Sequence, residues 1–166
     1  LFLWLDALES LPQITTIRIH TRLPIVIPER LDSELLSRLE ASRCRIVMVV
    51  HTNHANEIDE NTAQYLLQAK QKGITLLNQT VLLAGINDSL AVQVALNERL
   101  FEAGVLPYYL HLLDKVEGAA HFDMAKQQAV ELYWKMLEQL PGYLMPKLVQ
   151  ELPNRPFKTP VDLYQH

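Results

Sequence analysis

The residue of this chain best suited to covalent chemistry is Lys158, near the end of the sequence. It stands between Pro156 and Pro160, directly after an apolar strand predicted over residues 147–152 and seven residues beyond the carboxylate of Glu151. A lysine amine becomes a nucleophile when desolvation or a nearby cation lowers its pKa. The position is therefore typical of a lysine that forms a Schiff base at the mouth of a barrel.

Polar side chains also stand at the ends of the other predicted strands. The set comprises His20 and Arg22, His51 and Asn53, Gln79, Asp114, and Glu151 with Lys158. Ligands of parallel α/β sheets bind outside the carboxyl ends of the strands, so this repeated placement predicts one shared active-site face. Chance is the alternative, because every α/β protein has polar loops.

The elements that must position these side chains alternate between strand and helix patterns. β-Branched or apolar runs predict strands at residues 14–19, 25–27, 46–50, 74–77, 105–113 and 147–152. Apolar stripes and capping residues predict helices at 1–10, from Asp32, from Asp59 to Gly73, from Asn87 to Gly104, and at 124–139. This alternation predicts right-handed βαβ units, so we expect an α/β fold with the parallel strands of a TIM-like partial (β/α) barrel.

Composition narrows the class of protein. The 166 residues are 49% hydrophobic and 20% charged, which suits one domain or a piece of a larger one. A net charge of −4 with 15 scattered basic residues argues against a nucleic-acid partner. No apolar run is long enough to span a bilayer. The single cysteine, Cys44, excludes a disulfide framework and indicates a reducing cytosol.

Four stretches of the sequence carry a resemblance to a known family. They are Arg18-Ile-His-Thr-Arg-Leu-Pro-Ile-Val-Ile-Pro-Glu-Arg30, Asn53-His54 with Glu57-Ile58, Asn78-Gln-Thr-Val-Leu-Leu-Ala-Gly-Ile-Asn-Asp88, and Asp114 with His121-Phe122. Over nearly all of its length the chain resembles the C-terminal half of the lysine 2,3-aminomutase family of radical S-adenosylmethionine enzymes. Its ending, Leu152-Pro-Asn-Arg-Pro-Phe-Lys-Thr-Pro160, most resembles the members that form (R)-β-lysine for modification of elongation factor P.

The resemblance implies an isomerase that converts L-lysine to β-lysine by a 1,2 amino shift, using pyridoxal 5′-phosphate and S-adenosylmethionine. Lys158 matches the lysine that holds pyridoxal 5′-phosphate as an internal aldimine, in segment 147–166 of a barrel domain that covers residues 1–166. The family also needs a 4Fe–4S cluster on a CxxxCxxC motif, which this sequence lacks. We therefore expect the cluster ligands outside this chain, no metal site within it, and no activity from these residues alone. The implied enzyme is cytoplasmic, with a homo-oligomer as a further expectation.

The resemblance also implies roles for four polar residues. Asp114 and Glu151 match the positions of two carboxylates that bind the ε-ammonium of the substrate lysine. His51 and Gln79 match polar positions that line the cavity shared by the two cofactors. Plainer interpretations stand beside these: Asp114 as a loop cap, Glu151 as a solvent-facing strand end, and the other two as partners of strand-end backbone.

Two other functions stay open at this point. One is a Schiff-base lyase or aldolase on a TIM-type barrel, with Lys158 acting directly on a carbonyl substrate. The other is a non-catalytic α/β module that binds a partner. Two further residues receive structural predictions only: His111 is expected to be a hydrogen-bonded core histidine, and Asp123 is expected to cap a helix.

Overall fold

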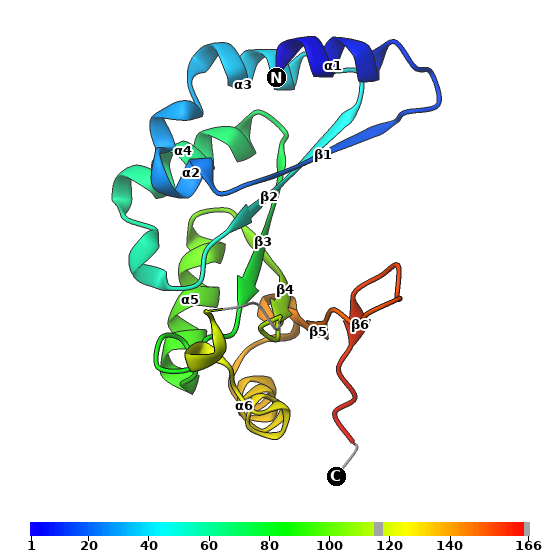
Figure 1. Cartoon of the computed structure of the whole chain (residues 1–166). Coiled ribbons are helices and arrows are strands. Elements are labelled where there is room, and N and C mark those ends of the chain that lie inside the picture. Colours follow the sequence, from blue (N-terminus) through cyan, green and yellow to red (C-terminus); the bar gives the residue numbers. More distant parts are fainter. Residues whose placement is uncertain (115–117, 165–166) are drawn as a thin grey trace.

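The computed structural model describes residues 1–114 and 118–164 as one α/β unit (Figure 1). Within these residues six strands form one sheet in the order β1-β2-β3-β4-β5-β6. The strands are β1 (Thr16–Thr21), β2 (Arg45–His51), β3 (Thr75–Val81), β4 (Leu106–His111), β5 (Lys147–Gln150) and β6 (Thr159–Pro160). β1 to β5 are parallel, and β6 runs antiparallel to β5. The last two residues of segment 147–166 lie outside the described part.

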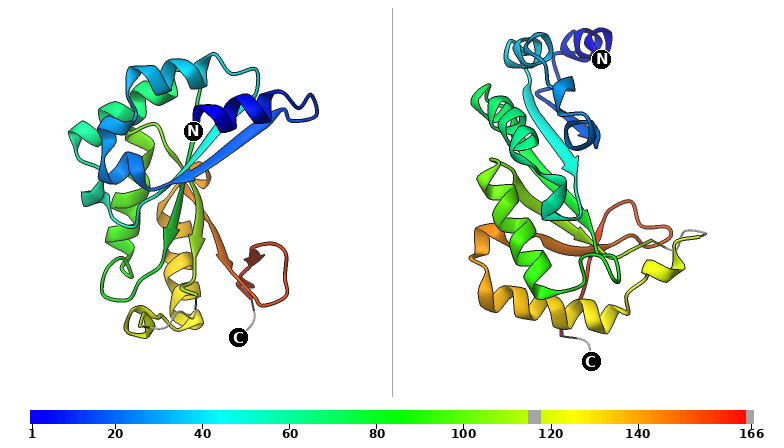
Figure 2. Two further views of the ribbon diagram at one scale, coloured as in Figure 1. Left: turned by 45° about the horizontal axis from the view of Figure 1, so that its top comes forward. Right: turned by 90° about the vertical axis from the view of Figure 1, so that its left-hand side faces the viewer.

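The described residues form six helices, of which α1 precedes β1 and the others lie in the connections between the parallel strands. They are α1 (Phe2–Glu9), α2 (Leu23–Val26), α3 (Ser33–Glu40), α4 (Glu60–Gln71), α5 (Leu90–Glu102) and α6 (Lys126–Gln139), with 3₁₀ turns η1 (Pro28–Arg30), η2 (Ala55–Glu57), η3 (Ala120–Phe122) and η4 (Gly142–Leu144). In side view α3, α4, α5 and α6 lie along one face of the twisted sheet (Figure 2). The predicted α/β fold with the strands of a partial (β/α) barrel is thus confirmed.

Local sequence signals account for where several helices begin. The Asp32 carboxylate accepts a hydrogen bond from the Leu35 N–H at 2.8 Å, and Asp59 accepts one from the Thr62 N–H at 2.7 Å. Ser89 caps α5 through the Val92 N–H in the same way. Such side chains satisfy backbone donors that the first turn of a helix leaves free. These three predicted helix starts are confirmed.

Three local predictions were wrong. Residues 25–27 do not form a strand, because Pro24 lies in the first turn of α2, where its fixed φ and missing N–H are tolerated. Asp123 does not cap α6, which begins at Lys126 with no side-chain capping bond. β3 continues to Val81, so Gln79 lies inside this strand and not beyond its end.

Two apolar clusters pack the helices onto the sheet and fix which side chains face them. The first surrounds β1 to β3 and includes Met48, Val50, Leu66, Leu76 and Leu100, and the second surrounds β4 to β6 and includes Leu110, Leu132, Met136, Leu148 and Val161. Each fully buried aliphatic side chain stabilises the fold by about 1.5–3 kcal/mol. Strand side chains alternate between the two faces of a sheet, so the residues between these core positions point away from the helices.

No helix in ranges 1–114 and 118–164 is both long enough and apolar enough to cross a membrane.

Candidate active site

Polar side chains line the sheet face that lies away from the helices. Strand register pairs His51 with Gln79 and Gln79 with Tyr109, and places His111 opposite Val81. A register shift between Asn78 and Gln79 brings Tyr109 into this row. We call the face defined by His51, Gln79, Tyr109 and His111 the open face.

Three of these side chains carry a buried polar atom that has no hydrogen-bond partner among the described residues. The atoms are Nε2 of His51, Oε1 of Gln79 and Nε2 of His111, and Oγ1 of Thr159 on β6 is a fourth. Leaving such an atom unpaired costs about 1–3 kcal/mol, so native proteins rarely do it without a ligand, water or function to explain it. The prediction that His111 is a hydrogen-bonded core residue was wrong, although the residue is buried.

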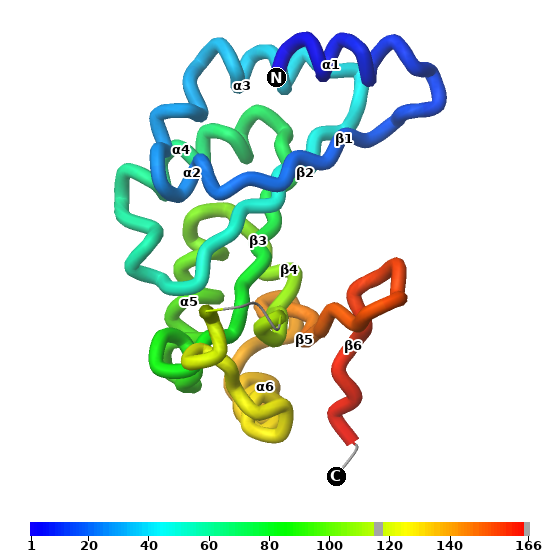
Figure 3. Tube along the Cα trace, in the orientation of Figure 1, coloured from blue at the N-terminus to red at the C-terminus, as the bar shows by residue number. Residues whose placement is uncertain are grey.

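The chain leaves the sheet at Glu151, directly after β5, and returns to it at Lys158, next to the Glu151 carboxylate. The segment after β5 loops outward and comes back at β6 (Figure 3), and Nζ of Lys158 donates to Oε1 of Glu151 at 2.8 Å. The same Nζ lies 5.7 Å from the centroid of the Tyr109 ring. Only 26% of the Lys158 side chain is exposed, against 56% for Glu151. The lysine amine is therefore partly desolvated and held by one carboxylate.

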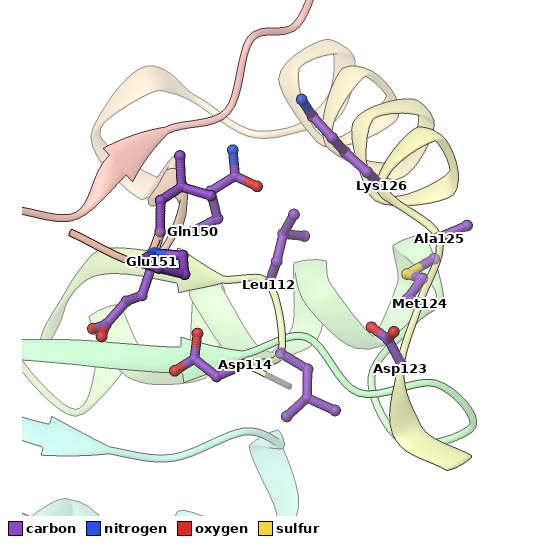
Figure 4. A pocket seen from close by; sticks show the side chains of 11 residues that line it. Leu112, Asp114, Asp123, Met124, Ala125, Lys126, Gln150 and Glu151 are labelled. Atoms are coloured by element: carbon purple, nitrogen blue, oxygen red, sulfur yellow. The ribbon is translucent and has the colours of Figure 1, made fainter. Parts of the chain in front are cut away.

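Asp114 and Glu151 lie next to each other at the ends of β4 and β5. Both line a cavity of about 700 Å³ that also touches the segment leading into α6 (Figure 4). Desolvation raises the pKa of Asp114 above its usual value, the negative charge of Glu151 raises it further, and Lys158 opposes both. The hydrogen bond from Lys158 instead lowers the pKa of Glu151. The three groups thus share one electrostatic environment.

Lys158 does not itself line that cavity. It lines a neighbouring one of about 340 Å³, together with Tyr109 of β4, Tyr133 of α6 and Lys147 of β5. Glu151 connects the two spaces, because it lines the first and hydrogen-bonds to the lysine of the second.

The surroundings of the two histidines on the open face lower the pKa of both imidazoles. Desolvation is the main cause that lowers the pKa of His51, and the charges of Arg22 and Lys158 add to it. Burial, followed by the charge of Lys158, lowers the pKa of His111 to about 4. The rings of His20 and His51 are arranged edge to face, with their centroids 5.8 Å apart. Neutral imidazoles offer hydrogen bonds without positive charge.

Sequence reasoning missed two residues of this region. His111 follows Tyr109 by two residues and precedes Asp114 by three. Residues two apart in a strand share a face of the sheet, so this spacing could have indicated that His111 faces the same side as Tyr109. Asp123 lines the same cavity as Asp114 and Glu151 and adds a third carboxylate to it. Its position just after the His121-Phe122 motif was the signal for Asp123.

The residues present fit one implied cofactor and do not fit another. A partly buried lysine amine beside unpaired polar atoms suits a carbonyl cofactor such as pyridoxal 5′-phosphate. The described residues offer no ligand set for an iron–sulfur cluster. Cys44 is buried with its Sγ donating to the Ile14 carbonyl, and the described residues contain no group of three His, Cys, Asp or Glu side chains able to hold a metal ion.

The comparison with curated proteins gives high similarity to one enzyme. The chain is 47% identical over 159 residues to the L-lysine 2,3-aminomutase of Escherichia coli K12, a match that covers 96% of this chain and 46% of that protein. It is 46% identical over 152 residues to the L-lysine 2,3-aminomutase of Haemophilus influenzae, covering 92% of this chain and 45% of the relative. The chain is homologous to the lysine 2,3-aminomutases. The resemblance drawn from the four sequence stretches is thereby confirmed.

More distant lysine 2,3-aminomutases match the same extent of the chain. The enzyme of Clostridium subterminale is 32% identical over 154 residues, which cover 93% of this chain and 37% of that protein. The chain spans about half the length, or less, of the aminomutases that it matches. No family model matches the chain.

Proposed function

We propose that these residues are part of a lysine 2,3-aminomutase, an isomerase that moves the α-amino group of L-lysine to the β-carbon. The observation that carries the proposal is the hydrogen bond of 2.8 Å between Lys158 and Glu151, with Asp114 lining the same cavity as Glu151. This arrangement occurs in a chain that is 47% identical to an L-lysine 2,3-aminomutase. It places the amine of Lys158 at one of two neighbouring carboxylates that are able to hold a cationic substrate.

In this proposal Lys158 is the catalytic lysine and the attachment point for pyridoxal 5′-phosphate. The bound cofactor supplies a carbonyl carbon that can carry the migrating nitrogen. The ring of Tyr109 lies 5.7 Å from Nζ of Lys158 and covers one side of this group, which limits the directions from which a carbonyl carbon can approach it. His51 and Gln79 orient the two cofactors, pyridoxal 5′-phosphate and S-adenosylmethionine, through their unpaired atoms.

Asp114 and Glu151 are proposed to bind the ε-ammonium of L-lysine. Two carboxylates attract one cation by about 4 kcal/mol each at 4 Å in an effective dielectric of 20, before desolvation costs. Glu151 already accepts a hydrogen bond from Lys158. Covalent attachment of the lysine amine to a carbonyl carbon removes at least two of its three N–H donors. Glu151 then becomes available to a second ammonium group.

The test uses the full-length protein, purified with its cluster and supplied with pyridoxal 5′-phosphate. Lys158→Ala should abolish both the visible absorbance of the lysine-bound cofactor and the conversion of L-lysine to β-lysine. Lys72→Ala is the control, because that lysine only pairs with Glu40 on the surface, and it should keep both signals. If Lys158→Ala retains the absorbance of the lysine-bound cofactor, the assignment of Lys158 as the attachment point is wrong. Borohydride trapping of a ketone substrate on Lys158 would instead favour a Schiff-base lyase.

We also propose where the full-length enzyme acts, what it supplies and how it assembles. Residues 152–160 resemble the ending of the family members that form (R)-β-lysine for elongation factor P. We therefore propose that the full-length protein acts in the cytoplasm and supplies (R)-β-lysine for this modification. We also propose a homo-oligomer, since Leu3 and Trp4 expose 85% and 73% of their surface. Mass spectrometry of elongation factor P from cells without the full-length protein should find the β-lysyl group missing.

A further inference from the structure

We propose that His111 is a positioning residue of this site, whose Nε2 donates a hydrogen bond to an anionic oxygen of the ligand held at Lys158. The proposal rests on the role of Lys158 given above. It adds a residue that the sequence patterns had assigned to the core.

The position of His111 points to a ligand and not to the packed core. Its strand neighbour Leu110 packs against the helices, so the imidazole faces the other way, onto the open face. The residue is only 5% exposed, and its Nε2 is buried without a partner among the described residues. Its ring centroid lies 5.6 Å from that of Tyr109, whose ring lies 5.7 Å from Nζ of Lys158. Tyr109 therefore has His111 and the lysine amine as near neighbours.

The charges around His111 select the kind of group that it binds. Lys158 and His51 both disfavour a proton on the imidazole, and Glu151 favours one less strongly than Lys158 opposes it. A neutral imidazole carries one N–H donor. A hydrogen bond to an ionised acceptor is about twice as strong as one to a neutral acceptor, so an anionic oxygen is the preferred partner for that donor. Two oxygens of the proposed complex meet this description: the phenolic oxygen of pyridoxal 5′-phosphate and the carboxylate of L-lysine.

A structural role for His111 predicts a different response to substitution. A buried histidine that holds the fold together through a hydrogen bond loses stability when an apolar residue replaces it. An unpaired histidine does not, because Leu fills a similar volume and removes the cost of the orphan nitrogen. His54 provides the matched comparison, since its Nδ1 accepts a hydrogen bond from Asn56 in the η2 capping box.

The experiment measures ligand affinity and melting temperature in full-length His111→Leu, His111→Gln and His54→Leu. His111→Leu should melt at or above the wild-type temperature without cofactor, yet bind its ligand about 10-fold or more weakly, which corresponds to about 1.4 kcal/mol. His111→Gln, which keeps a donor, should recover part of the affinity. His54→Leu should melt lower and bind normally.

Separate titrations distinguish the two oxygens. Weakened binding of pyridoxal 5′-phosphate alone assigns the phenolic oxygen, whereas weakened binding of lysine but not of lysinamide to the loaded protein assigns the substrate carboxylate. The inference is overturned if His111→Leu binds both ligands like wild type, or if it melts lower with unchanged affinity. If wild type and Lys158→Ala bind pyridoxal 5′-phosphate equally, the proposed function fails and takes the inference with it.

Discussion

Asn78 and Gln79 are neighbours in β3 with the same side-chain chemistry, but their surroundings differ completely. Asn78 faces the helices, where its Oδ1 accepts from the Thr52 N–H at 3.0 Å and its Nδ2 donates to the Thr52 carbonyl at 3.1 Å and to Thr80 Oγ1 at 2.8 Å. Gln79 faces the open side, and its Oε1 is buried without a partner. The same amide group therefore serves structure on one face of the sheet and is left free for a ligand on the other.

The contrast extends beyond this pair. On the helix side Asn87 donates to two backbone carbonyls and accepts one N–H, and Gln93 donates to the Asn87 carbonyl. On the open face His51 and His111 each leave a ring nitrogen unpaired. Buried polar groups thus fall into a satisfied set that joins loops to strands and an unsatisfied set near Lys158. The second set is where we place ligand binding.

The most severe test of this contrast is a pair of substitutions in β3. Asn78→Leu leaves the backbone N–H of Thr52 without an acceptor and removes one hydrogen bond of the Thr52 carbonyl. It should therefore reduce the free energy of unfolding by about 4 kcal/mol. Gln79→Leu removes an unpaired amide and should change the free energy of unfolding by less than about 1 kcal/mol. Urea denaturation of the full-length protein measures both values. Equal losses from the two variants would erase the distinction between the faces.

A second test uses acid, because the pKa of His111 is about 4 in the folded protein against an ordinary 6.5. Between these values the unfolded chain binds more protons, so the contribution of this residue is complete above pH 6.5 and is lost as the pH falls toward 4. The loss is about 3 kcal/mol. Burial is the main cause of the low pKa of His111 in the folded protein; the charges of Lys158 and His51 add to it, and Glu151 opposes them.

His111→Leu removes this dependence and is the matched variant for the acid test. Its stability should fall less than that of wild type between pH 7 and pH 4, as measured by urea midpoints at each pH on cofactor-free full-length protein. Parallel curves for the two proteins would mean that the imidazole is hydrated or protonated when folded. The assignment of a neutral, buried His111 would then be wrong.

Much of the fold was predictable because its signals are local. Asp32, Asp59 and Ser89 act within three residues of their own positions, and strand-to-helix alternation fixes the handedness of the connections. The strand predicted at residues 25–27 was wrong because a β-branched run does not reveal that Pro24 favours a helical turn at this point. Boundaries also shifted, as β3 runs four residues beyond its predicted end at 77.

The candidate site was less accessible to sequence reasoning, because its contacts depend on tertiary structure. Spacing placed a carboxylate seven residues before Lys158, but the antiparallel return at β6 is what brings Nζ to Glu151. Alternation indicated that His111 is buried without showing that its face offers no partner. Asp123 enters the cavity through the path of the chain into α6, which no short motif specifies.

The smallest expected effect concerns Arg22, at the edge of the open face. Its guanidinium pairs with Oε2 of Glu57, but half of the Arg22 side chain is exposed. Glu57 meanwhile holds the loop after β2 with its other oxygen, which accepts from the N–H groups of Asn53 and His54. Exposed ion pairs stabilise proteins by about 1 kcal/mol or less, so Arg22→Ala should cost no more than that in urea denaturation.

Arg22→Ala should nevertheless change the open face in a measurable direction. The positive charge of Arg22 is one of the causes that lower the pKa of His51, so its removal should raise that pKa. Titration of the His51 ring by NMR on the full-length protein measures the shift, and Arg38→Ala, which breaks pairs with Asp6 and Glu9 near α1, is the control that should leave it unchanged. An unchanged pKa of His51 would show that Arg22 does not contribute, which leaves desolvation and the charge of Lys158 as the causes of the lowered pKa. A large loss of stability would instead place Arg22 with the structural set, against the division between the two faces.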